Sequence, residues 1–194
     1  VSRLEDFWTQ ATAKPLYKSW LGGLPQGLLI EGGLYNSAPL KTFLNSQFST
    51  TSLKRSLNVG IVDLLSGLYV NYNEEMLADT KDLESVMYAS FSPVVFTAPA
   101  AVLGSSFVDG AAVWDIDIFS AINNCEALGF KEENRVVDVL LTIDKKVEVE
   151  DTESYNSLQM LYRYLTISRY YGAMDGLTRA QFAYPKVNFR NVVG

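Results

Sequence analysis

Residues 88–119, YASFSPVVFTAPAAVLGSSFVDGAAVWDIDIF, are the stretch that decides the fold. Residues 106–108 predict a short strand, and this strand ends at the tripeptide Asp109-Gly110-Ala111. A helix is expected to follow over roughly residues 115–127, ended by Gly129, because glycine often follows the last turn of a helix. The stretch therefore predicts a strand, a tight turn that carries a carboxylate, and a helix.

The segments before this stretch predict helices and one hairpin. Two β-rich runs, residues 57–65 and 67–72, are separated by Ser66-Gly67 and predict a β-hairpin. Asn36 and Ser37 precede Ala38-Pro39, which is a typical helix start. The remaining expectations are an amphipathic helix over residues 3–13, a glycine-rich extended loop over 20–33 and a helix over 79–90.

The segments after it contain one apolar run and one long helix. Residues 136–143, VVDVLLTI, predict a strand buried on both faces, as in a parallel sheet. A charged loop is expected over residues 145–153, and a helix with several aromatic residues over 157–171. Helices thus alternate with strands, so the expected class is α/β. The length predicts a single domain over residues 1–194.

The composition excludes several kinds of chemistry. The 194 residues contain no histidine, so the chain has no imidazole base and no histidine-ligated metal or haem site. Cys125 is the one cysteine, which excludes an internal disulfide and a cysteine-rich metal site. The net charge of −6 argues against nucleic acid as a partner. We expect no metal ion and no cofactor.

Several segments in this order resemble the C-terminal half of the patatin-like phospholipases. The resemblance rests on Ala89-Ser90-x-x-Pro93 followed by Asp109-Gly110-Ala111. Three further segments match in order, namely Leu34-Tyr35-Asn36-Ser37-Ala38-Pro39-Leu40, the run from Val59 to Asp63 with Ser66-Gly67-Leu68-Tyr69, and the run from Ile116 to Ile122. The similarity covers roughly residues 1–145, and residues 146–194 form the charged loop and the aromatic-rich helix.

The resemblance implies a three-layer α/β/α sandwich and a Ser–Asp catalytic dyad that works without histidine. Asp109 would be the base, and the substrates would be acyl esters of glycerolipids or phospholipids. The family's serine lies in a Gly-x-Ser-x-Gly elbow, which this chain lacks. The nearest segment, Gly104-Ser105-Ser106-Phe107-Val108, ends in valine and adjoins the aspartate motif. The nucleophile is thus expected upstream of Val1, together with the glycine-rich oxyanion loop.

Asp109 has a physical basis for this role. A serine hydroxyl attacks only when a base accepts its proton, and a carboxylate within hydrogen-bond distance can do so. Gly110 would let the backbone turn sharply and approach the nucleophile. The alternative is a turn aspartate with no chemistry, because Asp-Gly is a common turn pair.

Other side chains have both a chemical and a structural interpretation. Asp115 and Asp117, together with Asp109, could suggest a cation site, but Asp115 is expected to cap the following helix. Glu74 and Glu75 could serve glycoside hydrolysis, but adjacent glutamates after a hairpin favour a solvated surface. Cys125 has no histidine to activate it and is expected to be a buried helix residue.

The aromatic residues also have two interpretations. Trp8, Trp20 and Tyr35 could line an acyl channel, with core packing as the default. The helix over 157–171 could offer a face to a lipid headgroup or a partner, or could simply be half exposed. The residues concerned are Tyr162, Arg163, Tyr164, Arg169, Tyr170 and Tyr171.

Two functions from different classes remain open. The first is a lipid acyl hydrolase, intracellular and peripheral to a membrane or lipid-droplet surface. The second is a non-catalytic structural or lipid-binding subunit of a larger assembly, since fold does not fix function. Val1 and the abrupt end at Gly194 lead us to expect a longer polypeptide, whose upstream segment would complete the site. The sequence upstream of Val1 would discriminate between them.

Overall fold

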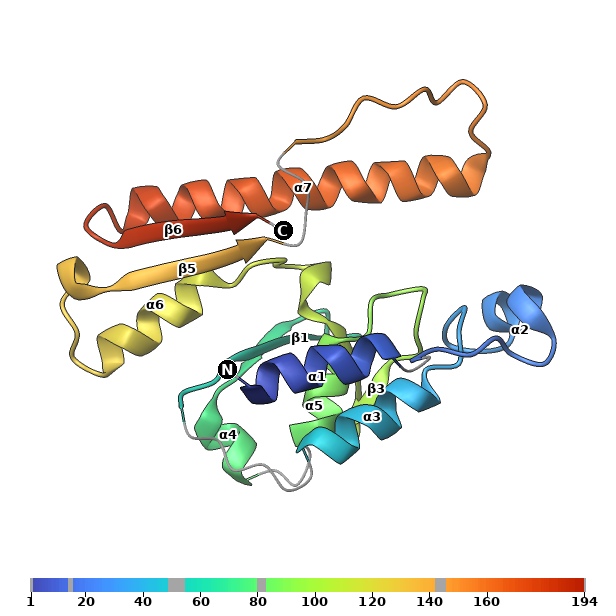
Figure 1. Ribbon diagram of the computed structural model, residues 1–194, viewed down its shortest axis with the longest axis horizontal. Coiled ribbons are helices and arrows are strands. Elements are labelled where there is room, and N and C mark those ends of the chain that lie inside the picture. Colours follow the sequence, from blue (N-terminus) through green and yellow to red (C-terminus); the bar gives the residue numbers. More distant parts are fainter. Residues whose placement is uncertain (1, 14–15, 49–54, 80–82, 142–145, 194) are drawn as a thin grey trace. The chain divides into compact units, whose positions relative to one another are not determined.

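The computed structural model describes residues 2–13, 16–48, 55–79, 83–141 and 146–193. The chain divides into two compact units, residues 1–113 and 114–194, which are described separately here (Figure 1). Both units combine helices with strands, so the expected mixed α/β class is confirmed.

The first unit contains a four-stranded antiparallel sheet. Its order is β2-β1-β4-β3, so that β1 (Val59–Asp63) and β4 (Ser105–Asp109) are the inner strands. The predicted hairpin is confirmed: β1 pairs with β2 (Tyr69–Tyr72), Val62 lying opposite Tyr69. Gly67 in the connecting turn has φ +73°, a conformation that glycine adopts at little cost.

The strand β3 (Ala100–Val102) completes the sheet through a second hairpin. Val102 lies opposite Ser105, so Leu103 and Gly104 form a two-residue turn. Both have positive φ, +48° and +84°, as tight hairpin turns between twisted strands require. This hairpin brings β4 against β1, where Ile61 lies opposite Asp109.

Five helices of the first unit surround or extend from this sheet. They are α1 (Ser2–Ala13), α2 (Gly23–Leu29), α3 (Ala38–Phe48), α4 (Glu74–Asp79) and α5 (Leu83–Ser90). The core lies between α3, α5 and the sheet, and Leu44, Ile61 and Val86 are fully buried in it. Phe7 of α1 packs against Phe43 of α3, with ring centroids 5.1 Å apart.

Two expectations for the first unit need correction. Residues 20–33 are not an extended loop throughout, because α2 forms a short helix within them. Gly27 permits this helix: a Cβ atom there would lie 2.5 Å from the carbonyl oxygen of Leu34, so only glycine allows the close contact. The helix expected over 79–90 is α5, which begins at Leu83; residues 80–82 lie outside the described residues.

The second unit pairs two parallel strands with two helices. It contains α6 (Ile118–Ala127), β5 (Val136–Leu141), α7 (Ser157–Ala183) and β6 (Asn188–Val193). The strands run parallel, with Val139 opposite Asn191. Ile122 of α6 and Leu177 of α7 pack with Val139 in one core. Gly129 ends α6 as predicted, with φ +84°.

The expectation that β5 is buried on both faces is wrong for the described residues. Val139 and Leu141 are buried, whereas Val136 and Leu140 are 52% and 73% exposed. The strand therefore alternates, because both helices pack on the same face of the pair. Residues 142 and 143 of the predicted strand lie outside the described residues. The long helix α7 does occur and continues to Ala183, twelve residues beyond the predicted end at 171.

Candidate functional site

Asp109 ends the inner strand β4 as predicted, and the 3₁₀ turn Gly110–Ala112 follows it directly. Its backbone N–H donates to the carbonyl oxygen of Ser92 at 3.1 Å. Its Oδ1 atom accepts a hydrogen bond from the backbone N–H of Ala111 at 3.0 Å. The half-buried carboxylate is thus held at a strand end by its own turn. This is a fixed position for a general base.

Gly110 is required by space rather than by backbone conformation. A Cβ atom at residue 110 would lie 2.6 Å from the carbonyl oxygen of Gly60, on the neighbouring strand β1. The close approach that Gly110 makes in the structure is therefore an approach to strand β1. The approach to a nucleophile stays a prediction.

Two residues next to Asp109 were missed by the sequence analysis. The ring of Tyr69 occupies the space that a side chain at Gly60 would need, and it also lies 3.2 Å from where a Cβ of Gly110 would be. Tyr69 and the two glycines thus form one packed group beside the aspartate turn. A glycine inside a strand often marks such a close approach, so Gly60 was the available signal.

Two serines near the aspartate motif are already hydrogen-bonded to other groups. Ser92 is fully buried, and its Oγ donates to the carbonyl oxygen of Tyr88 at 2.6 Å. Ser105, in the segment most similar to a nucleophile elbow, donates to Oδ1 of Asp63 at 2.7 Å. Neither of these bonds is made to Asp109, and a nucleophile upstream of Val1 stays a prediction.

The pair of Ser105 and Asp63 has the composition of a Ser–Asp dyad but the wrong chemistry for one. Asp63 also accepts from the backbone N–H of Leu65 at 3.0 Å and from Ser66 Oγ at 2.8 Å. These hydrogen bonds, led by that from Ser105, hold the pKa of Asp63 below its ordinary value. A carboxylate stabilised in its charged form is a weaker base, so Asp63 is best explained as a structural residue that closes the β1–β2 turn and ties it to β4.

The other acidic residues have structural partners. Asp117, rather than Asp115, caps α6 by accepting from the backbone N–H of Ser120 at 3.0 Å. The expected capping role of Asp115 is therefore wrong, because α6 begins at Ile118, and Asp115 lies two residues before the capping position. Asp115 instead forms an ion pair with Arg169 at 3.1 Å. Among the described residues, no group of three His, Cys, Asp or Glu side chains could hold a metal ion.

Glu74 and Glu75 begin α4 and differ in their surroundings. Glu74 accepts from Ser56 Oγ at 2.5 Å and from the backbone N–H of Leu57 at 3.3 Å, and these bonds, the first above all, lower its pKa. Glu75 is exposed, as expected for a solvated glutamate. Glu74 therefore connects the segment before β1 to the start of α4. Cys125 is half-buried on α6 rather than fully buried.

The three aromatic residues predicted as candidates for an acyl channel have different surroundings. Trp20 donates from its indole nitrogen to the carbonyl oxygen of Gly33 at 3.0 Å. Trp8 is 58% exposed and contacts Phe7, while Tyr35 is 37% exposed. None of the three belongs to the buried core, so the default of core packing is wrong for them. An acyl channel stays a prediction.

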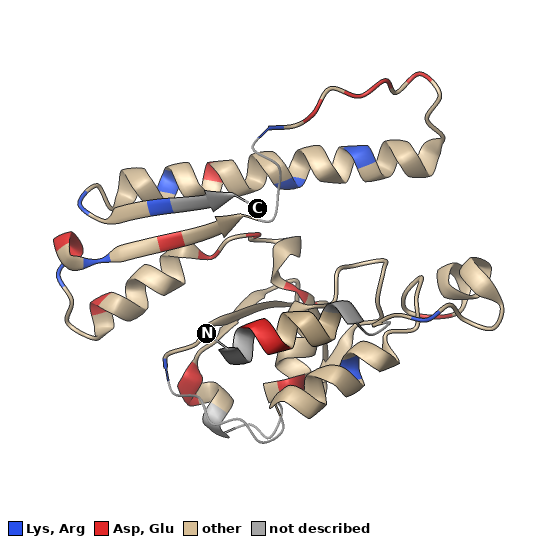
Figure 2. Ribbon diagram, in the orientation of Figure 1, with Lys and Arg blue, Asp and Glu red and all other residues tan. Residues whose placement is uncertain are grey.

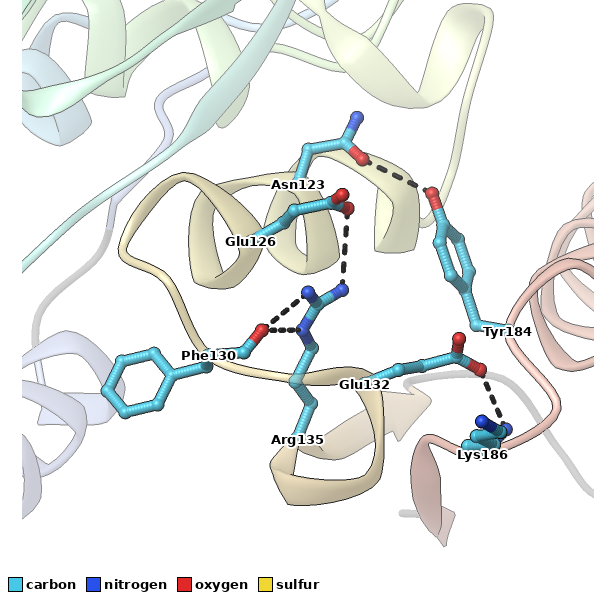
Figure 3. A network of polar contacts seen from close by, with 7 residues as sticks. All are labelled: Asn123, Glu126, Phe130, Glu132, Arg135, Tyr184 and Lys186. Carbon is cyan, nitrogen blue, oxygen red and sulfur yellow. Dashed lines mark hydrogen bonds and ion pairs between the residues drawn. The ribbon is translucent and has the colours of Figure 1, made fainter.

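A network of polar contacts in the second unit joins the end of α6 to β5 (Figure 3). Arg135 is 7% exposed and donates to the carbonyl oxygen of Phe130 from Nε at 2.9 Å and from Nη2 at 2.5 Å. It also lies 3.5 Å from the carboxylate of Glu126. Arg135 therefore stabilises the connection between α6 and β5.

The face proposed on α7 is largely exposed. Tyr162, Tyr164 and Tyr171 are 66%, 65% and 63% exposed. Arg163 pairs with Glu150 at 3.0 Å, and it also donates to the carbonyl oxygen of Glu148. The half-exposed interpretation is therefore confirmed, and a partner for this face stays a prediction. No helix in the described part of the chain is long and apolar enough to cross a bilayer.

Comparison with known proteins found no family model and no curated protein that matches this sequence.

Proposed function

We propose that this chain is the aspartate-bearing portion of a patatin-like lipid acyl hydrolase. The observation that supports the proposal most is the position of Asp109 at the end of an inner strand, followed by a glycine that nothing larger could replace. The order of motifs around it, described in the sequence analysis, agrees with this role. The proposed fold is the three-layer α/β/α sandwich, of which the chain would form part.

The proposed reaction uses a serine supplied from outside this chain. Asp109 accepts the proton of the serine hydroxyl while the serine oxygen attacks the ester carbonyl. The alcohol leaves with that proton, and an acyl-serine remains. Water then loses a proton to Asp109, attacks the acyl-serine and releases the fatty acid and the serine. Asp109 thus works as base, then acid, and then again as base and acid.

The proposed substrates are glycerolipids or phospholipids, reached from an intracellular position peripheral to a membrane or lipid droplet. The upstream segment of the same polypeptide, or another chain of an assembly, would supply the serine and the oxyanion loop. Backbone N–H groups there would stabilise the charge that develops on the carbonyl oxygen.

The test is fluorophosphonate labelling of the full-length protein, followed by peptide mass spectrometry. We expect the label on a serine outside residues 1–194, and Asp109→Asn should abolish both the label and ester hydrolysis. Asp63→Asn is the matched control, since Asp63 and Asp109 lie near opposite ends of the paired strands β1 and β4. It should reduce stability but leave labelling of the folded protein intact.

Two results would overturn the proposal. One is full peptide coverage with no labelled serine, which would leave the non-catalytic subunit as the better interpretation. The other is unchanged turnover in the Asp109→Asn variant, which would remove Asp109 from the mechanism.

A further inference from the structure

We propose that α2 and the neighbouring 91–96 loop form a docking surface for a zwitterionic phospholipid membrane. This inference rests on the proposed function, because it identifies how the lipid substrate would be reached. Five large aliphatic side chains around α2 are strongly exposed: Leu21 at 107%, Leu24 at 56%, Leu28 at 61%, Leu29 at 79% and Ile30 at 78%. Exposed apolar side chains gathered in one short segment are typical of interaction surfaces.

The backbone explains why these side chains face outward. Gly27 is the buried residue of α2, and it packs directly against the backbone of Leu34. Gly33 packs equally closely against the backbone of Thr97. The helix is therefore attached to its unit through glycines, and its leucines remain outside that contact. Within the first unit, α2 stands apart from the sheet (Figure 1).

The 91–96 loop continues this surface toward the candidate site. The backbone N–H of Leu34 donates to the carbonyl oxygen of Val95 at 2.8 Å. The backbone N–H of Tyr35 donates to the carbonyl oxygen of Phe96 at 3.0 Å. Val94, Val95 and Phe96 are themselves 48%, 50% and 39% exposed. The same loop contains Ser92, whose carbonyl oxygen accepts a hydrogen bond from the backbone N–H of Asp109. The apolar surface is thus joined to the aspartate turn by direct hydrogen bonds.

Val95 combines a strained backbone with an exposed side chain. Its φ is +77°, a conformation that β-branched residues adopt rarely and at a cost in stability. Glycine would fit that conformation without strain. A valine at this position costs stability, and a function for the exposed side chain would account for it.

The charge pattern favours a zwitterionic membrane over an anionic one. Residues 20–30, WLGGLPQGLLI, contain no charged side chain, and the ribbon of α2 is uncharged throughout (Figure 2). Lys18 and Glu31 flank this stretch with opposite charges, and the chain carries −6 overall. An anionic surface would repel such a chain. Aliphatic side chains bordered by Trp20 suit insertion among neutral lipid headgroups.

The test is co-flotation of the full-length protein with phosphatidylcholine vesicles. We expect binding to neutral vesicles, with little gain when anionic phosphatidylglycerol is added. The double variant Leu28→Asp with Leu29→Asp should weaken binding by about tenfold or more. The reason is that two apolar side chains no longer move from water into the membrane. Its melting temperature should stay unchanged, since both side chains are already exposed.

Leu65→Asp with Leu68→Asp is the matched control. These leucines are 88% and 64% exposed, but they lie in the β1–β2 turn, at the end of the sheet away from Asp109. This control should bind vesicles as the unaltered protein does. Val95→Gly should raise the melting temperature and yet weaken vesicle binding, a combination that loss of folding cannot produce.

The outcomes separate this inference from the proposed function. Vesicle binding that survives in the α2 variant, is lost in the β1–β2 turn variant, or requires anionic lipid would overturn the docking surface. Hydrolysis of a short-chain, water-soluble ester reports the proposed function alone, and the α2 variant should retain it. An inactive Asp109→Asn variant that still binds vesicles supports both proposals, whereas a protein that binds vesicles and hydrolyses no ester supports only the docking surface.

Discussion

Gly110 faces the carbonyl oxygen of Gly60 so closely that a Cβ atom at residue 110 would lie 2.6 Å from it. Gly60 lies on the inner strand β1, and Gly110 directly follows the other inner strand, β4. The ring of Tyr69 packs against both glycines. This relationship fixes the turn that carries Asp109 against strand β1. A side chain at residue 110 would move that turn, and with it the carboxylate, whereas a side chain at residue 60 would displace the ring of Tyr69.

We therefore predict that Gly110→Ala destabilises the protein by about 1–3 kcal/mol, the usual cost of forcing extra volume into a packed site. The same substitution should also lower any activity that depends on Asp109. Gly104→Ala is the control, because Gly104 faces open space but has φ +84°, so that only backbone strain of about 1–2 kcal/mol is added. Urea unfolding measures both, and equal activity losses in the two variants would contradict the packing argument.

Acid stability should depend on Asp63. Its pKa is lowered by hydrogen bonds in the folded state, first of all from Ser105. Such a group stabilises the fold above its unfolded pKa of about 3.9, and this contribution is lost as the pH falls through the lower folded pKa. Ser105→Ala should move the pKa of Asp63 up toward its ordinary value and weaken the loss of stability below about pH 4.

NMR titration of the Asp63 carboxyl and urea unfolding between pH 3 and 7 test this prediction. Ser106→Ala is the control, because Ser106 is the exposed neighbour on the same strand. A pKa of Asp63 that is the same in both variants would show that the hydrogen bond from Ser105 does not hold the charged form.

The buried pair of Ser37 and Tyr88 should be energetically coupled. Their oxygen atoms are 2.5 Å apart, and Tyr88 also donates to the carbonyl oxygen of Ala98 at 3.2 Å. Ser37→Ala and Tyr88→Phe should each cost about 1 kcal/mol, and the double variant should cost less than their sum. A thermodynamic cycle from urea unfolding measures the coupling. Strict additivity would mean that the two hydroxyls contribute independently.

Arg135 should matter far more to folding of the second unit than Arg190. Arg135→Met leaves the carbonyl oxygen of Phe130 without its two donors and should cost about 1–3 kcal/mol. Arg190 forms a bidentate pair with Asp138 at 2.5 and 2.6 Å, but this pair is exposed and screened by solvent. Arg190→Met should therefore change the midpoint of urea unfolding little. A larger loss for Arg190→Met would reverse this ranking.

Local patterns predicted much of the first unit because the relevant signals lie close together in the sequence. The β1–β2 hairpin follows from two β-rich runs and Ser66-Gly67, and the aspartate turn follows from the strand before it. The prediction for α2 failed because glycines usually indicate a loop, whereas Gly27 here gives room for the backbone of Leu34. That contact partner is seven residues away, beyond what local propensity describes.

The sequence by itself determined the absence of histidine chemistry, the mixed α/β class and the strand that ends at Asp109. These depend on composition and on short-range patterns of apolar residues. Only the tertiary structure decided that serines hydrogen-bond Asp63, that the turn after Asp109 packs against Gly60, and that the leucines around α2 stay exposed. Those outcomes depend on contacts between distant segments, such as Asp63 with Ser105 and Gly60 with Gly110, whose spacing no local pattern encodes.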